Sequence, residues 1–174
     1  MKIEQVDAKI TVIQATGLVA KDRNLFGKKT TSDPYVDVFS LGRQKIGKTK
    51  TQYKTLDPVW NHTVATTFRD VQLEPPYVLL KIWDEDNFSE PDAMGTIRVS
   101  FDLSKPDITE WYDVPPDSAK NASGKVQLRI QLQLHTSRAL VRGNEFELTT
   151  NRLRVGLAWD MLPGNKNIDL DVSC

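Results

Sequence analysis

The stretch Gly124–Leu134 carries the clearest structural signal in the sequence. Apolar residues alternate with polar ones through it, the apolar set being Val126, Leu128, Ile130, Leu132 and Leu134. A period of two places the apolar side chains on one face of a β-strand and the polar side chains on the other. Such a strand buries one face and exposes the other to water, as is typical of an antiparallel sheet.

Similar short alternations recur along the chain and are separated by turn-rich loops. They predict further strands at Ala8–Ala15, Pro34–Ser40, Lys45–Thr51, Thr63–Phe68, Tyr77–Asp84, Met94–Ser100 and Glu110–Asp113. No segment of more than about two turns has a helical pattern. Together with Gly124–Leu134 these segments predict an all-β fold, an eight-stranded antiparallel β-sandwich.

The pattern changes after Leu134, where a connector is followed by two further alternations. These alternations flank the turn Pro163-Gly164-Asn165 and predict a C-terminal β-hairpin tail. An isolated hairpin is marginal in water, so the tail is too small to be a domain. We therefore expect one domain over residues 1–137, a linker over 138–150 and the tail over 151–174.

Charge and composition exclude several classes of function. The 174 residues include 23 basic and 23 acidic side chains, so net attraction of the whole molecule to nucleic acid is not expected. The only cysteine, Cys174, excludes an internal disulfide and fits a reducing, cytoplasmic compartment. The two histidines, His62 and His135, belong to no zinc motif and stand beside no plausible nucleophile, so no enzymatic activity is predicted.

An acidic cluster follows the predicted strand Tyr77–Asp84. Asp84 and Asp86 are two residues apart and leave the strand end on one side, and Asp92 follows across a loop. Carboxylates gathered at one tip repel each other, by roughly 4 kcal/mol per pair at about 4 Å and an effective dielectric constant near 20. A cation is therefore expected here, and calcium suits Asp-rich loops.

Two other interpretations of this segment compete with a calcium loop. Counted from Asp84, a helix-loop-helix calcium motif requires Gly at the sixth position and Glu at the twelfth, but the chain has Ser89 and Gly95, so that motif is excluded. A solvated acidic loop is the alternative that the segment by itself leaves open. A second loop favours the metal, because Asp22 and Asp33 bracket it and raise the number of carboxylates to five.

In five segments the sequence resembles the C2 domain of conventional protein kinase C and synaptotagmin. They are, in order, Lys21-Asp22, Ser32-Asp33-Pro34-Tyr35-Val36, Thr55-Leu56-Asp57-Pro58-Val59-Trp60-Asn61, Trp83-Asp84-Glu85-Asp86 and Asp92-Ala93-Met94-Gly95. The resemblance covers roughly residues 5 to 135 and implies a C2-like sandwich. The strand order is similar to the family's second circular permutation, because nothing of strand length precedes Ala8.

The resemblance also implies a ligand set. The family's calcium ligands correspond to the side chains of Asp22, Asp33, Asp84, Asp86 and Asp92 and to backbone carbonyls at Lys21 and Glu85. Many family members lack several of these acids and bind no calcium, so the complete set favours a calcium-dependent member.

The tips of the two loops also carry apolar residues, Leu25, Phe26 and Phe88. In the family such tips enter a bilayer while calcium bridges the carboxylates to anionic phospholipid, so we expect these three side chains to insert and the protein to be recruited peripherally to membranes. Exposed apolar side chains in a loop need a target. The alternative is that Leu25 and Phe26 pack under their own loop.

A run of cations forms a second feature, and three of its members, Lys48, Lys50 and Lys54, share strand parity. In the family a basic stripe of this kind often binds phosphoinositide headgroups. The alternative is a solvated edge strand, because lysine on an edge strand prevents that strand from pairing with another sheet.

Near the C-terminus, Arg152–Asp160 together with Ile168–Asp171 looks like the truncated start of a tellurium-resistance (TerD-like) domain. That family is a calcium-binding β-sandwich, and the resemblance predicts a longer protein with a possible protein partner through the remainder of this domain. Two alternatives to a membrane-binding module stay open, a targeting fragment of a larger enzyme and a protein-protein adaptor.

Overall fold

Strands and the loops between them make up the part of the chain that the computed structural model describes, residues 2–23, 29–69, 71, 75–86 and 89–137. The strands are β1 (Lys2–Thr16), β2 (Asp22–Arg23), β3 (Lys29–Thr31), β4 (Pro34–Ser40), β5 (Gln44–Lys48), β6 (Val59–Arg69), β7 (Tyr77–Asp84), β8 (Asp92–Ser100), β9 (Asp107–Asp113) and β10 (Lys125–Ser137). No helix occurs within these described ranges. In particular, none of the described segments is a helix long and apolar enough to cross a membrane.

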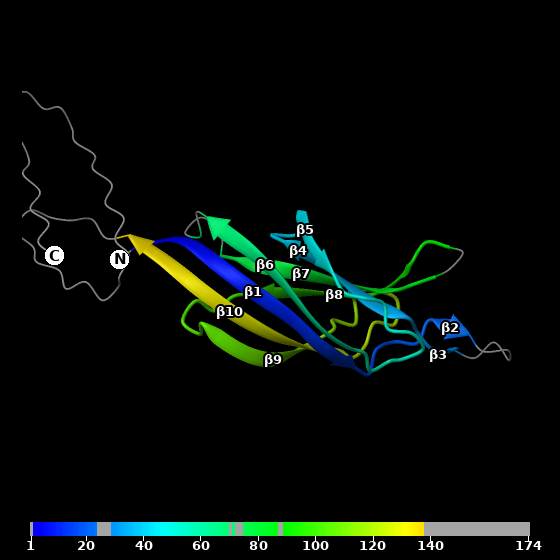
Figure 1. Cartoon of the computed structure of the whole chain (residues 1–174). Coiled ribbons are helices and arrows are strands. Elements are labelled where there is room, and N and C mark those ends of the chain that lie inside the picture. The colour runs from blue at the N-terminus through cyan, green and yellow to red at the C-terminus, as the bar shows by residue number, and fades with distance from the viewer. Residues whose placement is uncertain (1, 24–28, 70, 72–74, 87–88, 138–174) are drawn as a thin grey trace, which may run out of the picture. The chain divides into compact units, whose positions relative to one another are not determined.

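Two four-stranded sheets form the layers of the sandwich (Figure 1). The first has the order β6-β1-β10-β9 and the second the order β5-β4-β7-β8, and all their pairings are antiparallel. The prediction of an eight-stranded antiparallel β-sandwich is therefore confirmed. The short strands β2 and β3 form a separate two-stranded ribbon.

Strands β1 and β10 lie at the centre of the first sheet. Their register pairs Ile10 with Ile130 and Val12 with Leu128, and all four side chains are fully buried or nearly so. The alternation read from the sequence thus faces the core. Strand β1 begins earlier than predicted, because β10 continues to Ser137 and provides a pairing partner as far back along β1 as residue 2.

The inner face of the second sheet completes the core with Val36, Val38, Leu80, Ile82 and Val99. Each fully buried side chain of this size contributes about 1.5–3 kcal/mol through apolar burial. The layers also meet through aromatic packing, where the rings of Phe68 and Phe101 lie edge to face with centroids 5.5 Å apart.

Some predicted features differ from the structure or lie outside the described residues. The loop after β1 contains the β2–β3 ribbon, in which Asp22 pairs with Thr31 although neither strand has an alternating apolar pattern. Strand β5 ends at Lys48, three residues before the predicted end at Thr51. The predicted linker and hairpin tail, residues 138–174, lie outside the described part of the chain.

Candidate metal centre

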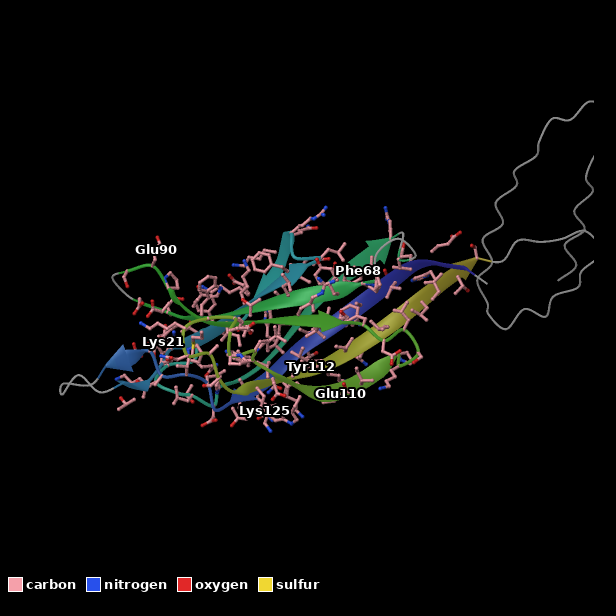
Figure 2. The ribbon with its side chains drawn as sticks, turned by 180° about the vertical axis from the view of Figure 1, so that it is seen from behind. Lys21, Phe68, Glu90, Glu110, Tyr112 and Lys125 are labelled. Carbon is pink, nitrogen blue, oxygen red and sulfur yellow. The ribbon has the colours of Figure 1, made fainter. Side chains whose placement is uncertain are left out.

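Several loops meet at the end of the sandwich that carries the β2–β3 ribbon (Figure 1). The backbone N–H of Glu85, which follows β7, donates to the carbonyl of Asp33 (3.0 Å). The Lys21 ammonium donates to the carbonyl of Lys120 (3.0 Å) in the loop after β9. Figure 2 shows Lys21 and Glu90 at this same end. Loops attached to both sheets therefore converge there.

Three of the predicted aspartates are placed by strands of the second sheet. Asp33 immediately precedes β4, Asp84 is the last residue of β7, and Asp92 is the first residue of β8. The register pairs Asp84 with Asp92 on one side and with Pro34 on the other. Antiparallel pairing therefore brings three acids that are distant in sequence to one end of one sheet.

Asp84 is the most buried of these acids, being only 1% exposed. Its Oδ1 accepts a hydrogen bond from the backbone N–H of Asp33, whereas its Oδ2 is buried and has no hydrogen-bond partner among the described residues. Burial, together with the carboxylates of Asp22 and Asp86, raises the pKa of Asp84 to about 6, although the Asp33 N–H and the nearby Ser32 hydroxyl oppose this shift. A buried carboxylate with an unpartnered oxygen fits a cation-binding role.

Asp22 and Asp86, the two remaining predicted aspartates, lie close enough to the others for their charges to interact. Burial raises the pKa of Asp22, and the negative charges of Asp33, Asp86 and Asp92 raise it further. Through Asp22 and Asp84, the charges of all five predicted aspartates are thus linked. No three acidic, histidine or cysteine side chains within the described residues form a closed metal-binding cluster as they stand.

Asp33 is held from two sides by the backbone. Besides its own N–H bond to Asp84, its Oδ1 accepts a hydrogen bond from the N–H of Lys54 (2.6 Å), a residue of the β5–β6 loop with a positive φ of 53°. The buried Ser32 beside it was not predicted to matter. Its Oγ accepts from the N–H of Lys21 (2.8 Å) and donates to the carbonyl of Val19 (3.1 Å). Ser32 therefore fixes the backbone around two of the predicted ligand positions.

A second residue that sequence reasoning missed is Asp57. It lies on the β5–β6 loop and contacts the start of the loop after β1. Its Oδ1 accepts hydrogen bonds from Thr16 Oγ1 (2.6 Å) and from the N–H of Gly17 (2.8 Å). These bonds lower the pKa of Asp57. Neither Ser32 nor Asp57 stands in a spacing that marks such a role, although both lie within segments that carried the family resemblance.

The side chain of Glu85 is directed to a lysine. Its carboxylate lies 3.4 Å from the Lys48 ammonium and accepts from Thr51 Oγ1 at 3.5 Å. The backbone carbonyl of Glu85 accordingly remains its candidate ligand atom, as the resemblance implied. The Lys48 ammonium also lies 3.6 Å from the centroid of the Tyr35 ring, so two partners already engage this cation.

The predicted basic stripe has a different geometry from the one expected. Because β5 ends at Lys48, Lys50 and Lys54 lie on the following loop and do not continue one strand face. Thr49, between Lys48 and Lys50, is buried and accepts a hydrogen bond from the N–H of Val36 (2.9 Å). Lys50 and Lys54 are exposed. The three predicted membrane-inserting residues, Leu25, Phe26 and Phe88, lie outside the described part of the chain.

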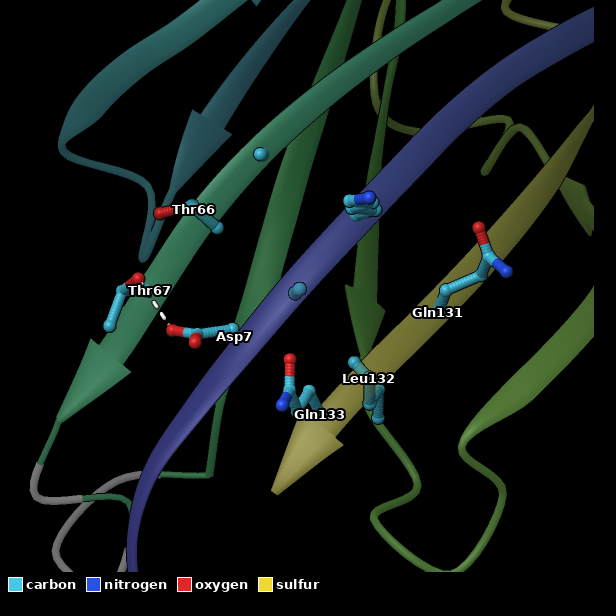
Figure 3. Close-up of a pocket in the computed structure, with 9 residues that line it drawn as sticks. Asp7, Thr66, Thr67, Gln131, Leu132 and Gln133 are labelled. Atoms are coloured by element: carbon cyan, nitrogen blue, oxygen red, sulfur yellow. Dashed lines mark hydrogen bonds between the residues drawn. The ribbon is translucent and has the colours of Figure 1, made fainter. Parts of the chain in front are cut away.

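A shallow, open hollow of about 530 Å³ lies elsewhere, across β6, β1 and β10 (Figure 3). Its lining includes Asp7, Thr67 and Gln131 and none of the predicted site residues. The Asp7 carboxylate accepts from Thr67 Oγ1 (2.7 Å) and lies 2.8 Å from His135 Nε2. These side chains satisfy one another, so the acidic end of the sandwich is the better candidate site.

Comparison with known proteins bears on the fold and the family. The family model for the C2 domain matches residues 7–114. The Rho GTPase-activating protein gacEE of Dictyostelium discoideum is 33% identical over 145 residues, which cover 77% of this chain and 25% of that protein. Synaptotagmin-2 of Mus musculus is 37% identical over 109 residues, which cover 60% of this chain and 24% of synaptotagmin-2. The chain thus spans about a quarter of the length of these relatives.

Solved structures share the fold. The calcium-bound pair of C2 domains, A and B, of Extended-Synaptotagmin 2 aligns with a TM-score of 0.63 at 23% identity, covering 76% of this chain and 47% of that one. The C2 domain designated A of a plant Extended Synaptotagmin 1 aligns with a TM-score of 0.57 at 23% identity, covering 79% and 99% of the two chains. At these identities the likeness establishes the architecture alone.

Proposed function

The chain belongs to the C2 domain family, and from this premise we propose that it binds calcium through its acidic loops and then binds anionic phospholipid membranes. The observation that carries the proposal is the buried Asp84, whose Oδ2 lacks a hydrogen-bond partner among the described residues and whose neighbours are also carboxylates. The side chains of Asp22, Asp33, Asp84, Asp86 and Asp92, with the carbonyls of Lys21 and Glu85, would hold the ion.

The chain's own residues prepare this site before any ion binds. The N–H groups of Asp33 and Lys54 orient the Asp84 and Asp33 carboxylates, and Ser32 holds the backbone between the two arms of the first loop. Bound calcium would neutralise the carboxylates and offer open coordination positions to anionic phosphate oxygens. Without it, the clustered negative charge of the loops repels an anionic membrane surface.

We further propose that Leu25, Phe26 and Phe88 insert into the membrane and that recruitment is peripheral. Each side chain that leaves water completely adds about 1.5–3 kcal/mol, and partial burial adds less. Binding is therefore expected to combine a calcium-dependent electrostatic contact with a small apolar one.

Calorimetric titration with calcium and sedimentation with phosphatidylserine-containing vesicles test the proposal. Asp86→Asn is expected to weaken calcium binding about tenfold or more, since it removes one ligand charge. Asp107→Asn is the matched control, because Asp107 lies on β9 and pairs with Arg129 (2.8 Å) away from the acidic loops. Vesicle binding by the wild-type chain in chelator, or undiminished binding by Asp86→Asn, contradicts the mechanism.

The domain arrangement is a separate proposal. Residues 1–137 would form the C2 domain, 138–150 a linker and 151–174 a TerD-like segment, an assignment that rests on the sequence patterns alone. A fragment of residues 1–137 should then retain the calcium-dependent vesicle binding of the full chain. Loss of binding in this fragment, with its fold intact by circular dichroism, contradicts the boundary.

A further inference from the structure

Tyr53 stands out among the large apolar side chains of the described residues because it is 70% exposed. It lies on the loop that connects β5 to β6, and this loop reaches the acidic end of the sandwich (Figure 1). The next most exposed large apolar residues, Val59 at 52% and Trp111 at 40%, lie on strands of the first sheet. A single exposed ring is common on protein surfaces, so Tyr53 is distinguished by its place beside the acidic end and not by its exposure alone.

Hydrogen bonds on both sides of Tyr53 fix its place beside the acids. The N–H of Gln52 donates to the carbonyl of Pro34 (3.0 Å), and the N–H of Lys54 donates to Asp33 Oδ1 (2.6 Å). The N–H of Thr55 donates to the carbonyl of Ser32 (2.9 Å). The ring is thus carried by backbone bonded directly to the segment that presents Asp33.

Two lysines flank Tyr53 and favour an anionic partner once calcium has neutralised the nearby aspartates. Lys50 and Lys54 are both exposed, and neither forms an ion pair with another described residue. Lys48, only a few residues earlier, is by contrast engaged by Glu85 and by the Tyr35 ring. The loop therefore presents an amphipathic phenol between two available ammonium groups.

We propose that Tyr53, with Lys50 and Lys54, forms an interfacial anchor that rests in the headgroup layer of an anionic phospholipid membrane. Tyrosine has an apolar ring and a polar hydroxyl, and such side chains concentrate at membrane-water interfaces. Neighbouring lysines add attraction to anionic headgroups within a Debye length of the surface. The inference rests on the proposed function, because the anchor lies at the same end as the calcium loops and adds a third contact to them.

Vesicle binding by Tyr53 variants tests the anchor. With phosphatidylserine/phosphatidylcholine vesicles at saturating calcium, Tyr53→Ala is expected to lower the partition coefficient about fivefold, and Tyr53→Phe to retain most of it. Trp111→Ala is the matched control. Trp111 is also an exposed ring beside a lysine, since Lys125 Nζ lies 5.2 Å from the ring centroid, but it belongs to strand β9 and not to the β5–β6 loop. This control is expected to bind as the wild type does.

Calcium titration without lipid separates the anchor from the metal centre. Tyr53→Ala should keep the wild-type calcium affinity, whereas loss of that affinity would assign the residue to the site and contradict an anchoring role. If the wild-type chain binds vesicles and Tyr53→Ala binds equally well, the anchor is wrong and the proposed function stands. If the wild-type chain itself fails to bind vesicles with calcium, both the anchor and the proposed function are wrong.

Discussion

The backbone N–H of Asp33 donates a hydrogen bond to Oδ1 of Asp84, which joins the residue before β4 to the last residue of β7. This bond occupies one oxygen of the buried carboxylate and fixes its orientation. The other oxygen is left without a hydrogen-bond partner among the described residues, within a group of five aspartates. Stability and calcium affinity should therefore both depend on how this region is packed.

The first prediction concerns the pH dependence of the calcium-free protein. The folded-state pKa of Asp84 is about 6, above its ordinary value of 3.8, so the folded protein takes up a proton at a higher pH than the unfolded chain. The free energy of unfolding should therefore rise as the pH falls from about 6 to about 4, by up to about 3 kcal/mol from this group. Urea denaturation in chelator at a series of pH values measures it.

Asp84→Asn provides the control for that experiment. The amide cannot ionise, so the variant should be more stable than the wild type at pH 7 in chelator and should lose this part of the pH dependence. Equal pH dependence of the wild type and Asp84→Asn would show that the buried carboxylate is not the source.

The second prediction concerns Ser32, which is fully buried and bonded to Lys21 and Val19. Ser32→Ala removes two hydrogen bonds of the hydroxyl, but the Lys21 N–H still donates to the carbonyl of Thr31 (3.1 Å), so the protein should be destabilised by only about 1 kcal/mol. Calcium affinity should fall as well, because the loop that carries Asp22 loses a bond. The exposed Ser123, whose Oγ donates to the carbonyl of Gly17 (3.0 Å), makes Ser123→Ala a milder comparison. If Ser32→Ala and Ser123→Ala have the same denaturation curve, the buried Ser32 hydroxyl does not have this structural role.

The third prediction concerns Gly95 on β8. A Cβ at this position would overlap Cγ1 of Val114 and come within 3.2 Å of Ser118 Oγ, in the loop after β9. Gly95→Ala should therefore destabilise the protein by about 1–3 kcal/mol through overpacking. The double variant Gly95→Ala/Val114→Ala tests the cause, because removing the valine methyls should make the added methyl less costly. Strictly additive effects in this double-mutant cycle would exclude the contact.

The fourth prediction separates the lysines of the predicted headgroup site. Lys48 is engaged by Glu85 and Tyr35, whereas Lys50 and Lys54 are exposed on the following loop. Replacing both Lys50 and Lys54 with Ala should weaken binding to phosphoinositide-containing vesicles more than Lys48→Met does. Sedimentation at two salt concentrations provides the measurement, since the effect should shrink as salt screens the charges. A loss from Lys48→Met as large as that from the double variant would contradict this separation of the lysines.

The strands were predictable because period-two alternation is a local property of the chain. Val126, Leu128 and Ile130 alternate with polar residues, and the structure buries all three almost completely. The β2–β3 ribbon escaped prediction for the opposite reason. It spans only a few residues, and its pairing of Asp22 with Thr31 depends on the course of the loop, not on an apolar pattern.

For the candidate site, the order of residues was enough to identify the carboxylates and to place them at strand ends, as with Asp84 at the end of β7. The folded chain was needed to learn that Asp84 is buried with one oxygen unpartnered among the described residues, that Lys48 lies beside Glu85, and that Tyr53 faces water near Asp33. The physical reason is that burial, pKa and ion pairing depend on which distant segments pack together. Sheet register and loop hydrogen bonds set that packing, and no local pattern of residues encodes it.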